Sequence, residues 1–468
     1  MPNPLAPEWL DASVDANALV PGIWANGVER DGSGQLSVQG ITASDLAHNF
    51  GTPLYVMDED HARARAEQVR AAFDAACTSI GTTAKVYYAG KAFLCTEVVR
   101  LVVDSGLYVD VASGGELAVA LAAGIDPARI GLHGNNKSVA EIERAVSVGV
   151  GTIVIDSDWE VERVASAAAS AGRTQRVRLR VNSGVHASTH SFLATAHEDQ
   201  KFGITIADAP ALVEHIRSFD SLEFVGLHCH IGSQIFGTTG FAESAKRIVA
   251  LHAQLASVAP VAELNLGGGF GIAYKPGDAP TDIETIAAEI AQAVAAECAA
   301  NQVAVPVLAF EPGRTIVGTS TFTLYSVGTT KEVSVEVDGA AATRLYVSVD
   351  GGMSDNARPA LYGAEYHVRL ANRISPADAA LVRIAGKHCE SGDIVVNADY
   401  LPGDVEPGDL LAVPATGAYC WSLASNYNYL ARPAVVAVRG GEARVIVRGE
   451  TEHDLLARDA GIDERNRS

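Results

Sequence analysis

Residues 84–111 read AKVYYAGKAFLCTEVVRLVVDSGLYVDV. Two short runs rich in Val and Tyr flank a longer segment whose apolar residues recur with helical period, so the stretch predicts a strand, a helix and a second strand. The same pattern continues along the chain at intervals of 23, 22, 23 and 24 residues, and each interval has room for one strand, one helix and two short loops. The five strands so predicted begin near Lys85, Tyr108, Ile130, Ile153 and Val177.

Three further apolar runs bring the number of predicted strands to eight. They are EFVGLHCH (223–230), ELNLGGG (263–269) and PVLAFEPGR (306–314). The strands are continuous apolar runs, as expected when helices cover both faces of a parallel sheet. Polar residues follow many of the strands instead of gathering at one point of the chain, which favours a closed barrel over an open doubly wound sheet. The predicted fold class is therefore α/β, with a (β/α)8 barrel of the TIM type.

Helix starts inside the repeat are marked by residues at the spacing of capping boxes. Ser138 lies three residues before Glu141, and Ser157 lies three residues before Glu160. In a capping box the serine side chain accepts a hydrogen bond from the third N–H of the helix, and the acid accepts one from the serine N–H. We therefore expect a helix to begin at each of these serines.

The sequence changes character after Arg314. Alternating runs such as TFTLYSV, RLYVSVD and AVVAVRG, separated by Gly, Pro and Asp, predict an all-β region in which no long amphipathic helix is expected. The first 45 or so residues are also rich in strand and turn signals. We therefore expect residues 1–49 to join a C-terminal β-sandwich or β-barrel domain at 313–468, and residues 50–312 to form the barrel.

The amino-acid composition limits which binding partners and which cellular compartment are expected. The chain has 468 residues, 48% of them hydrophobic, which is more than one core usually holds. Lys and Arg number 35 against 56 Asp and Glu, so the formal charge is 35 − 56 = −21, which argues against nucleic acid and anionic membranes as partners. The six cysteines are scattered without a C-x-x-C pair, and no signal peptide or long apolar span is recognised. We expect a protein of the cytoplasm.

Several residues at predicted strand ends are candidates for chemistry. The GGGFG stretch at 267–271 can cradle a phosphate with its backbone N–H groups, or it can be a flexible turn. It matches neither the P-loop nor the Rossmann pattern. Lys91, flanked by apolar residues, is a candidate nucleophile, although a lysine judged alone is more often a surface residue.

The acid and the histidines have two interpretations each. Glu311 and Arg314 can form a local salt bridge, or Glu311 can pair with the ring nitrogen of a cofactor. His228 and His230 lie two apart on a strand and share a face. They can bind zinc, but no third ligand occurs at a helpful spacing, so no metal site is predicted; a histidine stacked on a flat cofactor is at least as well supported.

Seven motifs, in this order, resemble the fold-type III pyridoxal-phosphate decarboxylases, and most closely their diaminopimelate branch. The resemblance spans about residues 50–432 and implies an alanine-racemase-like β/α barrel followed by a β domain. The motifs are YYAGKAF, HCHIGSQ, LGGGFG, EPGR, RPALYGAEY, CESGD and GAYCWSLASNYN.

The resemblance implies a role for individual positions around pyridoxal 5'-phosphate. Lys91 resembles the lysine that forms the Schiff base, His230 the histidine stacked on the ring, and Glu311 the acid that pairs with the ring nitrogen. The full set implied for cofactor binding is Lys91, Asp110, His230, Ser233, Gly267, Gly268, Gly269, Glu311, Gly313, Arg314 and Tyr419. His228 has no assigned role, and buried packing is expected for it.

The resemblance also implies the reaction. Cys389 resembles the proton donor, so Lys91 and Cys389 are the predicted catalytic residues. A second carboxylate on the substrate fits the forked guanidinium of Arg358, and an ammonium fits Glu390, so the predicted reaction converts meso-2,6-diaminopimelate to L-lysine and CO2, the last step of lysine biosynthesis. The residues implied for substrate binding are Arg314, Arg358, Tyr362, Glu390 and Tyr419.

Two alternatives and one assembly prediction accompany this interpretation. A related decarboxylase acting on ornithine, arginine or a D-amino acid is the first alternative. A non-catalytic binding protein, similar to the antizyme inhibitors, is the second, and it is disfavoured because the lysine, the acid, the cysteine and the glycine loop are all present. The family resemblance implies a homodimer whose active sites are shared between the two chains.

Overall fold

The computed structural model describes residues 3–185, 201–256, 258–337 and 339–462. The chain divides into two compact units. The first consists of Met1–Ala62, Ala273–Asp278 and Val317–Ser468, and the second of Arg63–Ile272 and Ala279–Ile316. We refer to them as the β-rich unit and the barrel unit.

The barrel unit is a closed ring of eight parallel strands, as predicted. The strands pair in the order β5-β6-β7-β8-β9-β11-β12-β13, and the ring closes because β13 pairs with β5. The strands are β5 (Ala84–Ala89), β6 (Tyr108–Val111), β7 (Ile130–Leu132), β8 (Thr152–Ile155), β9 (Gln175–Asn182), β11 (Leu222–His228), β12 (Glu263–Asn265) and β13 (Val307–Phe310). A two-residue strand, β10 (Ile204–Thr205), adds to β9.

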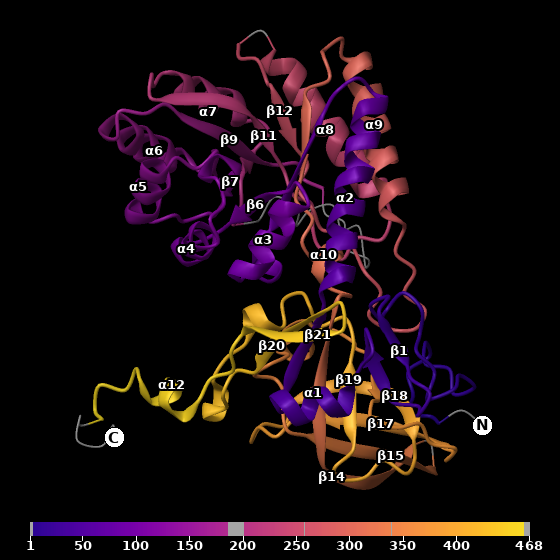
Figure 1. The fold of residues 1–468 in the computed structure, drawn as a ribbon. Helices are drawn as coiled ribbons and strands as arrows, with labels where there is room; N and C mark the ends of the chain where they lie inside the picture. The colour runs from indigo at the N-terminus through magenta and orange to yellow at the C-terminus, as the bar shows by residue number, and fades with distance from the viewer. Residues whose placement is uncertain (1–2, 186–200, 257, 338, 463–468) are drawn as a thin grey trace. The chain divides into compact units, whose positions relative to one another are not determined.

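Helices alternate with the strands and lie outside them (Figure 1). Their inward faces are buried, as Val98, Val99, Leu101 and Val102 of α3 show. The helices are α2 (Glu59–Ser79), α3 (Thr96–Asp104), α4 (Gly114–Ala122), α5 (Val139–Val148), α6 (Asp158–Ser170), α7 (Ala209–Arg217), α8 (Thr239–Leu255), α9 (Ile283–Ala300) and α10 (Arg314–Val317). Two short 3-10 turns, η1 (Gly90–Ala92) and η2 (Pro127–Arg129), follow β5 and precede β7.

One of the two predicted capping boxes is confirmed and the other is wrong. Ser138 accepts from the Glu141 N–H at 3.2 Å, and the Glu141 side chain accepts from the Ser138 N–H at 2.9 Å. Ser157 makes no such side-chain bond at the start of α6. Glu160 instead accepts from Lys137 Nζ at 2.9 Å, because both side chains are buried and a buried carboxylate requires a charged partner.

The β-rich unit is built on a long sheet in the order β18-β17-β15-β14-β4-β20-β21. Its strands are β4 (Leu54–Asp58), β14 (Thr321–Val337), β15 (Ala340–Val349), β17 (Ala379–Ala385), β18 (Ile394–Pro402), β20 (Ala434–Arg439) and β21 (Glu442–Val447), with β16 (Arg369–Leu370) and β19 (Leu410–Val413) joined through β14. Its short helices and turns are α11 (Arg358–Tyr362), η3 (Trp421–Leu423), η4 (Tyr427–Tyr429) and α12 (Glu452–Leu456). The predicted all-β character of this region is confirmed.

The N-terminal segment completes the β-rich unit. It forms a small sheet of β1 (Val28–Arg30), β2 (Leu36–Val38) and β3 (Ile41–Thr42), followed by α1 (Ala43–Phe50). Strand β4 then pairs with β14 on one side and with β20 on the other. These long-range pairings place Leu54–Asp58 in the sheet, whereas the sequence pattern alone put the start of the barrel domain at residue 50.

None of the helices within the described ranges combines the length and the apolar character that crossing a membrane requires.

Candidate active site

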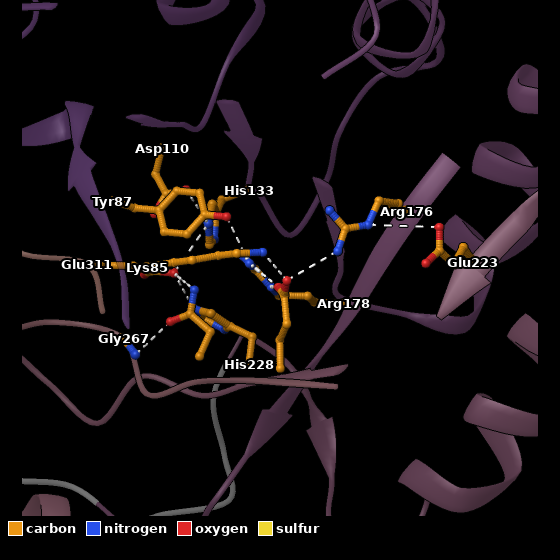
Figure 2. Close-up of polar contacts among 12 residues, drawn as sticks. Lys85, Tyr87, Asp110, His133, Arg176, Arg178, Glu223, His228, Gly267 and Glu311 are labelled. Atoms are coloured by element: carbon orange, nitrogen blue, oxygen red, sulfur yellow. Dashed lines mark hydrogen bonds and ion pairs between the residues drawn. The ribbon is translucent and has the colours of Figure 1, made fainter. Parts of the chain in front are cut away.

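Polar side chains converge at the C-terminal ends of the barrel strands. Asp110 lies in β6, His133 follows β7, His228 ends β11, Asn265 ends β12 and Glu311 follows β13. Because parallel strands of a barrel end at the same rim, residues far apart in the sequence become neighbours there. Figure 2 shows Asp110, His133 and His228 gathered around Glu311.

Glu311 is the centre of this group. Its Oε1 accepts a hydrogen bond from Asn265 Nδ2 at 2.7 Å, and it lies 2.9 Å from His228 Nε2 and 3.4 Å from His133 Nε2. Burial alone would raise the pKa of Glu311, but the neighbouring rings of His228 and His133 hold it well below its ordinary range. Glu311 is therefore an anion at neutral pH.

Asp110 is the second acid of the group, and its pKa is shifted in the opposite direction. It is buried, and His133 Nε2 lies 3.2 Å from its Oδ1. Burial, and then the charge of Glu311, raise the pKa of Asp110 well above its ordinary value. Two carboxylates in one low-dielectric site do not both ionise readily, so Asp110 holds a proton more readily than Glu311 does.

The three histidines of the rim are neutral at neutral pH. Burial lowers the pKa of His133 and of His228 to about 4. Burial, followed by the charge of Lys91, lowers the pKa of His230 to about 3. His228 is buried as expected, but its contact with Glu311 shows that packing is not its whole role.

Three of these groups also meet the distance requirement of a cation site. The ligand atoms of His133, His228 and Glu311 all lie within 4.8 Å of one another. The sequence did not reveal a third ligand, because Glu311 and His133 come from strands distant from the H-C-H motif. Two imidazoles and a carboxylate suit Zn²⁺, and they equally suit the protonated nitrogen of an aromatic cofactor.

The glycine loop after β12 packs so closely that side chains do not fit. A Cβ on Gly268 would lie 2.0 Å from the Glu311 carbonyl oxygen, and one on Gly269 would lie 2.1 Å from the Gly232 carbonyl oxygen. Gly267 adopts φ +70°. Its N–H donates to Asn265 Oδ1 at 2.9 Å, and the Gly268 N–H donates to His230 Nδ1 at 3.3 Å. The loop is thus a compact backbone turn beside the ring of His230.

Lys91 lies on η1, next to the segment that carries Glu311. The N–H of Ala89 donates to the Pro312 carbonyl at 2.9 Å, and a Cβ on Gly313 would lie 3.1 Å from the Cβ atoms of Ala89 and Ala92. This close packing fixes the turn of Lys91 against the end of β13. Lys91 itself is exposed, so its amine is accessible from the barrel rim.

Ser233 and Arg314 meet on the same rim. Arg314 donates to Ser233 Oγ at 2.8 Å, and Arg314 is buried whereas Ser233 is exposed. A hydroxyl and a guanidinium brought together beside a glycine loop form a set of donors suited to a phosphate.

A layer of charge inside the barrel lies beneath the rim (Figure 2). Arg178 of β9 is fully buried and donates to Glu263 Oε2 at 2.6 Å and to the Tyr87 hydroxyl at 2.9 Å. Lys85 also contacts Glu263. Burial would raise the pKa of Glu263, but Arg178 and Lys85 lower it to about 2. This ion pair is therefore intact at neutral pH.

Arg358 lies in the β-rich unit at the start of α11 and is almost fully buried. Its guanidinium lies over the ring of Tyr274 at 4.6 Å and over that of Tyr366 at 5.5 Å, and it donates to the Tyr366 hydroxyl. The aromatic side chains hold the guanidinium in one orientation. Tyr362, at the other end of α11, is 69% exposed.

Cys389 and Glu390 belong to an exposed loop of the same unit. The Cys389 N–H donates to Asn428 Oδ1 at 3.0 Å. The preceding His388 lies 2.9 Å from Asp393 Oδ2 through its Nδ1 and stacks on Tyr427 at 5.5 Å. The loop is thus anchored on both sides of an exposed thiol. Tyr419 is half-buried and has a positive φ of 68°.

The rim of the barrel fits a flat, polar, phosphorylated cofactor. Oδ2 of Asp110 and Nδ1 of His228 are buried and have no hydrogen bond within the described part of the chain. Buried polar atoms without a partner fit a site for a polar group, and Ser233 with Arg314, beside the glycine turn, offers donors for a phosphate. The fold and this site define a barrel enzyme that binds an aromatic phosphate cofactor.

Comparison with known proteins agrees with this class. Residues 65–318 match the family model described as pyridoxal-dependent decarboxylase, pyridoxal binding domain. The chain is 50% identical over 447 residues to a diaminopimelate decarboxylase of Mycobacterium tuberculosis, covering 94% of this chain and 98% of that protein. It is also similar to the crystal structure of a diaminopimelate decarboxylase from M. jannaschii in complex with L-lysine, with a TM-score of 0.83 and 31% identity, covering 93% of this chain and 98% of that one.

The chain belongs to the pyridoxal-dependent decarboxylases, and its cofactor is pyridoxal 5'-phosphate. Within that class it belongs to the diaminopimelate decarboxylase family, as the sequence motifs predicted.

Three residues of the site were not singled out from the sequence. His133 and Asn265 each end or directly follow a short apolar strand, so applying the strand-end rule to all eight strands would have found both. Arg178 lies in RVRLRV, whose alternation suggests that the arginines face solvent; in the structure the side chain of Arg178 points into the barrel.

Proposed function

We propose that this chain decarboxylates meso-2,6-diaminopimelate to L-lysine and CO2, the last step of lysine biosynthesis. The observation that carries the reaction type is the anionic, half-buried Glu311 beside a glycine turn at the rim of the barrel, next to the accessible amine of Lys91. Near-full-length similarity to proteins named diaminopimelate decarboxylase supports the choice of substrate.

The rim residues divide the work of holding the cofactor. Lys91 would hold its aldehyde carbon, and His230 would lie against its ring. Glu311 would pair with the ring nitrogen, because a carboxylate stabilises a neighbouring cation. The residues proposed to hold the phosphate are Ser233, Gly267, Gly268, Gly269, Gly313 and Arg314. Asp110, whose pKa is raised, would lie beside the acid, and Tyr419 is the remaining residue proposed for cofactor binding.

When bound, the cofactor supplies an electron sink for the pair left on Cα as CO2 departs. The chain's own groups then manage charge and protons. Glu311 holds a proton at the ring nitrogen. The Cys389 thiol delivers a proton to Cα, since a thiol is a competent acid near neutral pH. Burial of the rim residues excludes water and strengthens these electrostatic interactions.

The far end of the substrate carries an ammonium and a second carboxylate, and the β-rich unit offers a group for each. The guanidinium of Arg358, oriented by Tyr274 and Tyr366, matches the carboxylate. The side chain of Glu390 matches the ammonium. Tyr362, Arg314 and Tyr419 would line the remaining surface of the substrate. Product analysis with meso-diaminopimelate, ornithine, arginine and D-lysine tests the assignment, and a preference for any of the other three would refute it.

Replacement of Arg358 by alanine should lower kcat/KM for diaminopimelate at least thirtyfold, since losing one partner of a buried charged pair costs about 2–5 kcal/mol. D-lysine lacks the second carboxylate, so its slower turnover should change little. Arg448→Ala, which removes an exposed arginine paired with Asp454, is the matched control. Equal losses on both substrates would show that Arg358 does not recognise the distal carboxylate.

We also propose a homodimer in which each active site draws on both chains. Exposed apolar side chains in the β-rich unit support an interface: Leu361 is 59% exposed, Tyr362 69% and Tyr429 69%. The exposed thiol of Cys389 lies in the same unit, available to a partner's barrel.

We place the protein in the cytoplasm, which the absence of any disulfide among its six cysteines supports.

Mixing two inactive variants tests the shared site. In a mixed dimer of Lys91→Ala and Cys389→Ala, one site collects both lesions and the other has neither. Half of randomly paired dimers are mixed, so activity should recover to about a quarter of the wild-type value. Native mass spectrometry confirms that mixed dimers form. If they form and activity stays at the level of the parents, Cys389 acts within its own chain.

A further inference from the structure

Asn265 links the glycine turn to the acid of the cofactor site. It ends β12 and is fully buried. Its Oδ1 accepts from the Gly267 N–H at 2.9 Å, and its Nδ2 donates to Glu311 Oε1 at 2.7 Å. The Glu311 N–H in turn donates to the Gly267 carbonyl at 2.8 Å. The Asn265 amide thus joins the glycine turn, proposed to hold the cofactor phosphate, to Glu311, proposed to pair with the ring nitrogen.

The orientation of this amide follows from its partners. A backbone N–H can only donate, so the atom of Asn265 that faces Gly267 must be the oxygen. The NH2 group is therefore turned toward Glu311, and Oε1 of Glu311 must accept. An accepting Oε1 is satisfied by an ionised carboxylate without any further proton. Because a hydrogen bond to a charged acceptor is stronger than one to a neutral acceptor, this fixed donor favours the ionised form of Glu311.

The same oxygen collects the other neighbours of Glu311. His228 Nε2 and His133 Nε2 lie 2.9 and 3.4 Å from Oε1, on strands at either side of the barrel. Asp110, from β6, lies beside His133 at 3.2 Å. Every contact described above for this side chain falls on Oε1. A carboxylate held through one oxygen presents the other to a ligand.

We propose that Asn265 is a positioning residue that, with His133 and His228, holds Glu311 through Oε1 as an anion and presents Oε2 to the ring nitrogen of the cofactor. This inference rests on the proposed role of Glu311. It extends the site by residues that do not themselves touch the reacting atoms.

The isosteric change Asn265→Asp isolates the contact. The aspartate keeps an oxygen for the Gly267 N–H but places a second carboxylate oxygen against Oε1, which favours a proton shared between the two acids. Titration of the apoenzyme should show roughly tenfold weaker binding of pyridoxal 5'-phosphate, which corresponds to about one pKa unit. The 1-deaza analogue, in which carbon replaces the ring nitrogen, should lose less than threefold. Equal losses for both ligands would overturn the proposal.

A double-mutant cycle tests whether Asn265 acts through Glu311. In a Glu311→Gln background, Asn265→Asp should change cofactor affinity less than threefold, because the anion that it disturbs is already absent. Additive losses would overturn the proposal. If the Asn265 variant does not fold, His228→Leu and His228→Gln form a second pair. Leucine removes the N–H and should weaken binding of the cofactor but not of the deaza analogue. Glutamine keeps a donor and should restore the binding of the cofactor. His215→Gln, on α7, is the surface control.

The binding measurements separate this proposal from the proposed function. Cofactor affinity is measured without any amino-acid substrate. Wild-type protein that binds pyridoxal 5'-phosphate but leaves diaminopimelate unchanged would refute the substrate and leave the positioning role standing. Wild-type protein that decarboxylates diaminopimelate but shows additive losses in the cycle would refute the positioning role alone.

Discussion

Replacement of Lys91 by alanine is expected to abolish turnover, with a loss on the order of 10⁴-fold or more, as when a covalent catalytic group is deleted. The loss is expected because of where the Lys91 amine lies. The turn η1 is bound to the Glu311 segment by the Ala89–Pro312 hydrogen bond and by close packing at Gly313. The amine of Lys91 is accessible there, and no other group at the rim described above offers one.

Two other barrel lysines show why the assignment is specific. Lys85 contacts Glu263, and Lys137 lies 2.9 Å from Glu160, so both amines are occupied by buried carboxylates. Borohydride reduction of the holoenzyme followed by peptide mass spectrometry should place the pyridoxyl group on Lys91. Lys246→Ala, an exposed position of α8, should leave both activity and labelling unchanged. Label on Lys85 or Lys137 would contradict the assignment.

The barrel was predictable because its signal is local and repeated. The first five strands recur every 22 to 24 residues and most strands are apolar runs, so errors at single boundaries do not change the architecture. Strand β4 has no such signal. Its place is decided by pairing with β14 and β20, hundreds of residues away in the sequence, and no local pattern reports those pairings.

Site residues that belong to a sequence motif could be predicted, whereas residues whose role depends on their three-dimensional neighbours could not. Lys91 and Glu311 were found through motifs of the resembling family. Asn265 directly precedes the LGGGFG motif, and its importance appears only when Gly267 and Glu311 are seen on its two sides. For Glu160 a sequence pattern predicted a contact that the structure does not contain. Its spacing from Ser157 is that of a capping box, but its carboxylate binds the buried amine of Lys137 instead. A buried ion without a charged partner is costly, so the ion pair forms in preference to the cap.

Replacement of Glu311 by glutamine is expected to lower kcat by two to three decades, because electrostatic stabilisation of this kind is worth about 3–4 kcal/mol. Glutamine keeps an oxygen for Asn265 and His228, so the fold of the rim should persist, but it removes the negative charge opposite the ring nitrogen. Glu243→Gln on α8, which removes an exposed acid paired with Arg247, is the matched control and should have no effect.

The pH dependence gives the Glu311→Gln experiment a second, independent readout. Since the pKa of Glu311 is held well below its ordinary range, the wild-type acid is ionised throughout the range from about pH 6 to 9, and protonation would remove its effect only at much lower pH. The ratio of wild-type to variant kcat should therefore stay constant across that range. A ratio that narrows between pH 7 and 6 would mean that Glu311 gains a proton there, and a loss of less than threefold with decarboxylation rate-limiting would show that its charge does not support the electron sink.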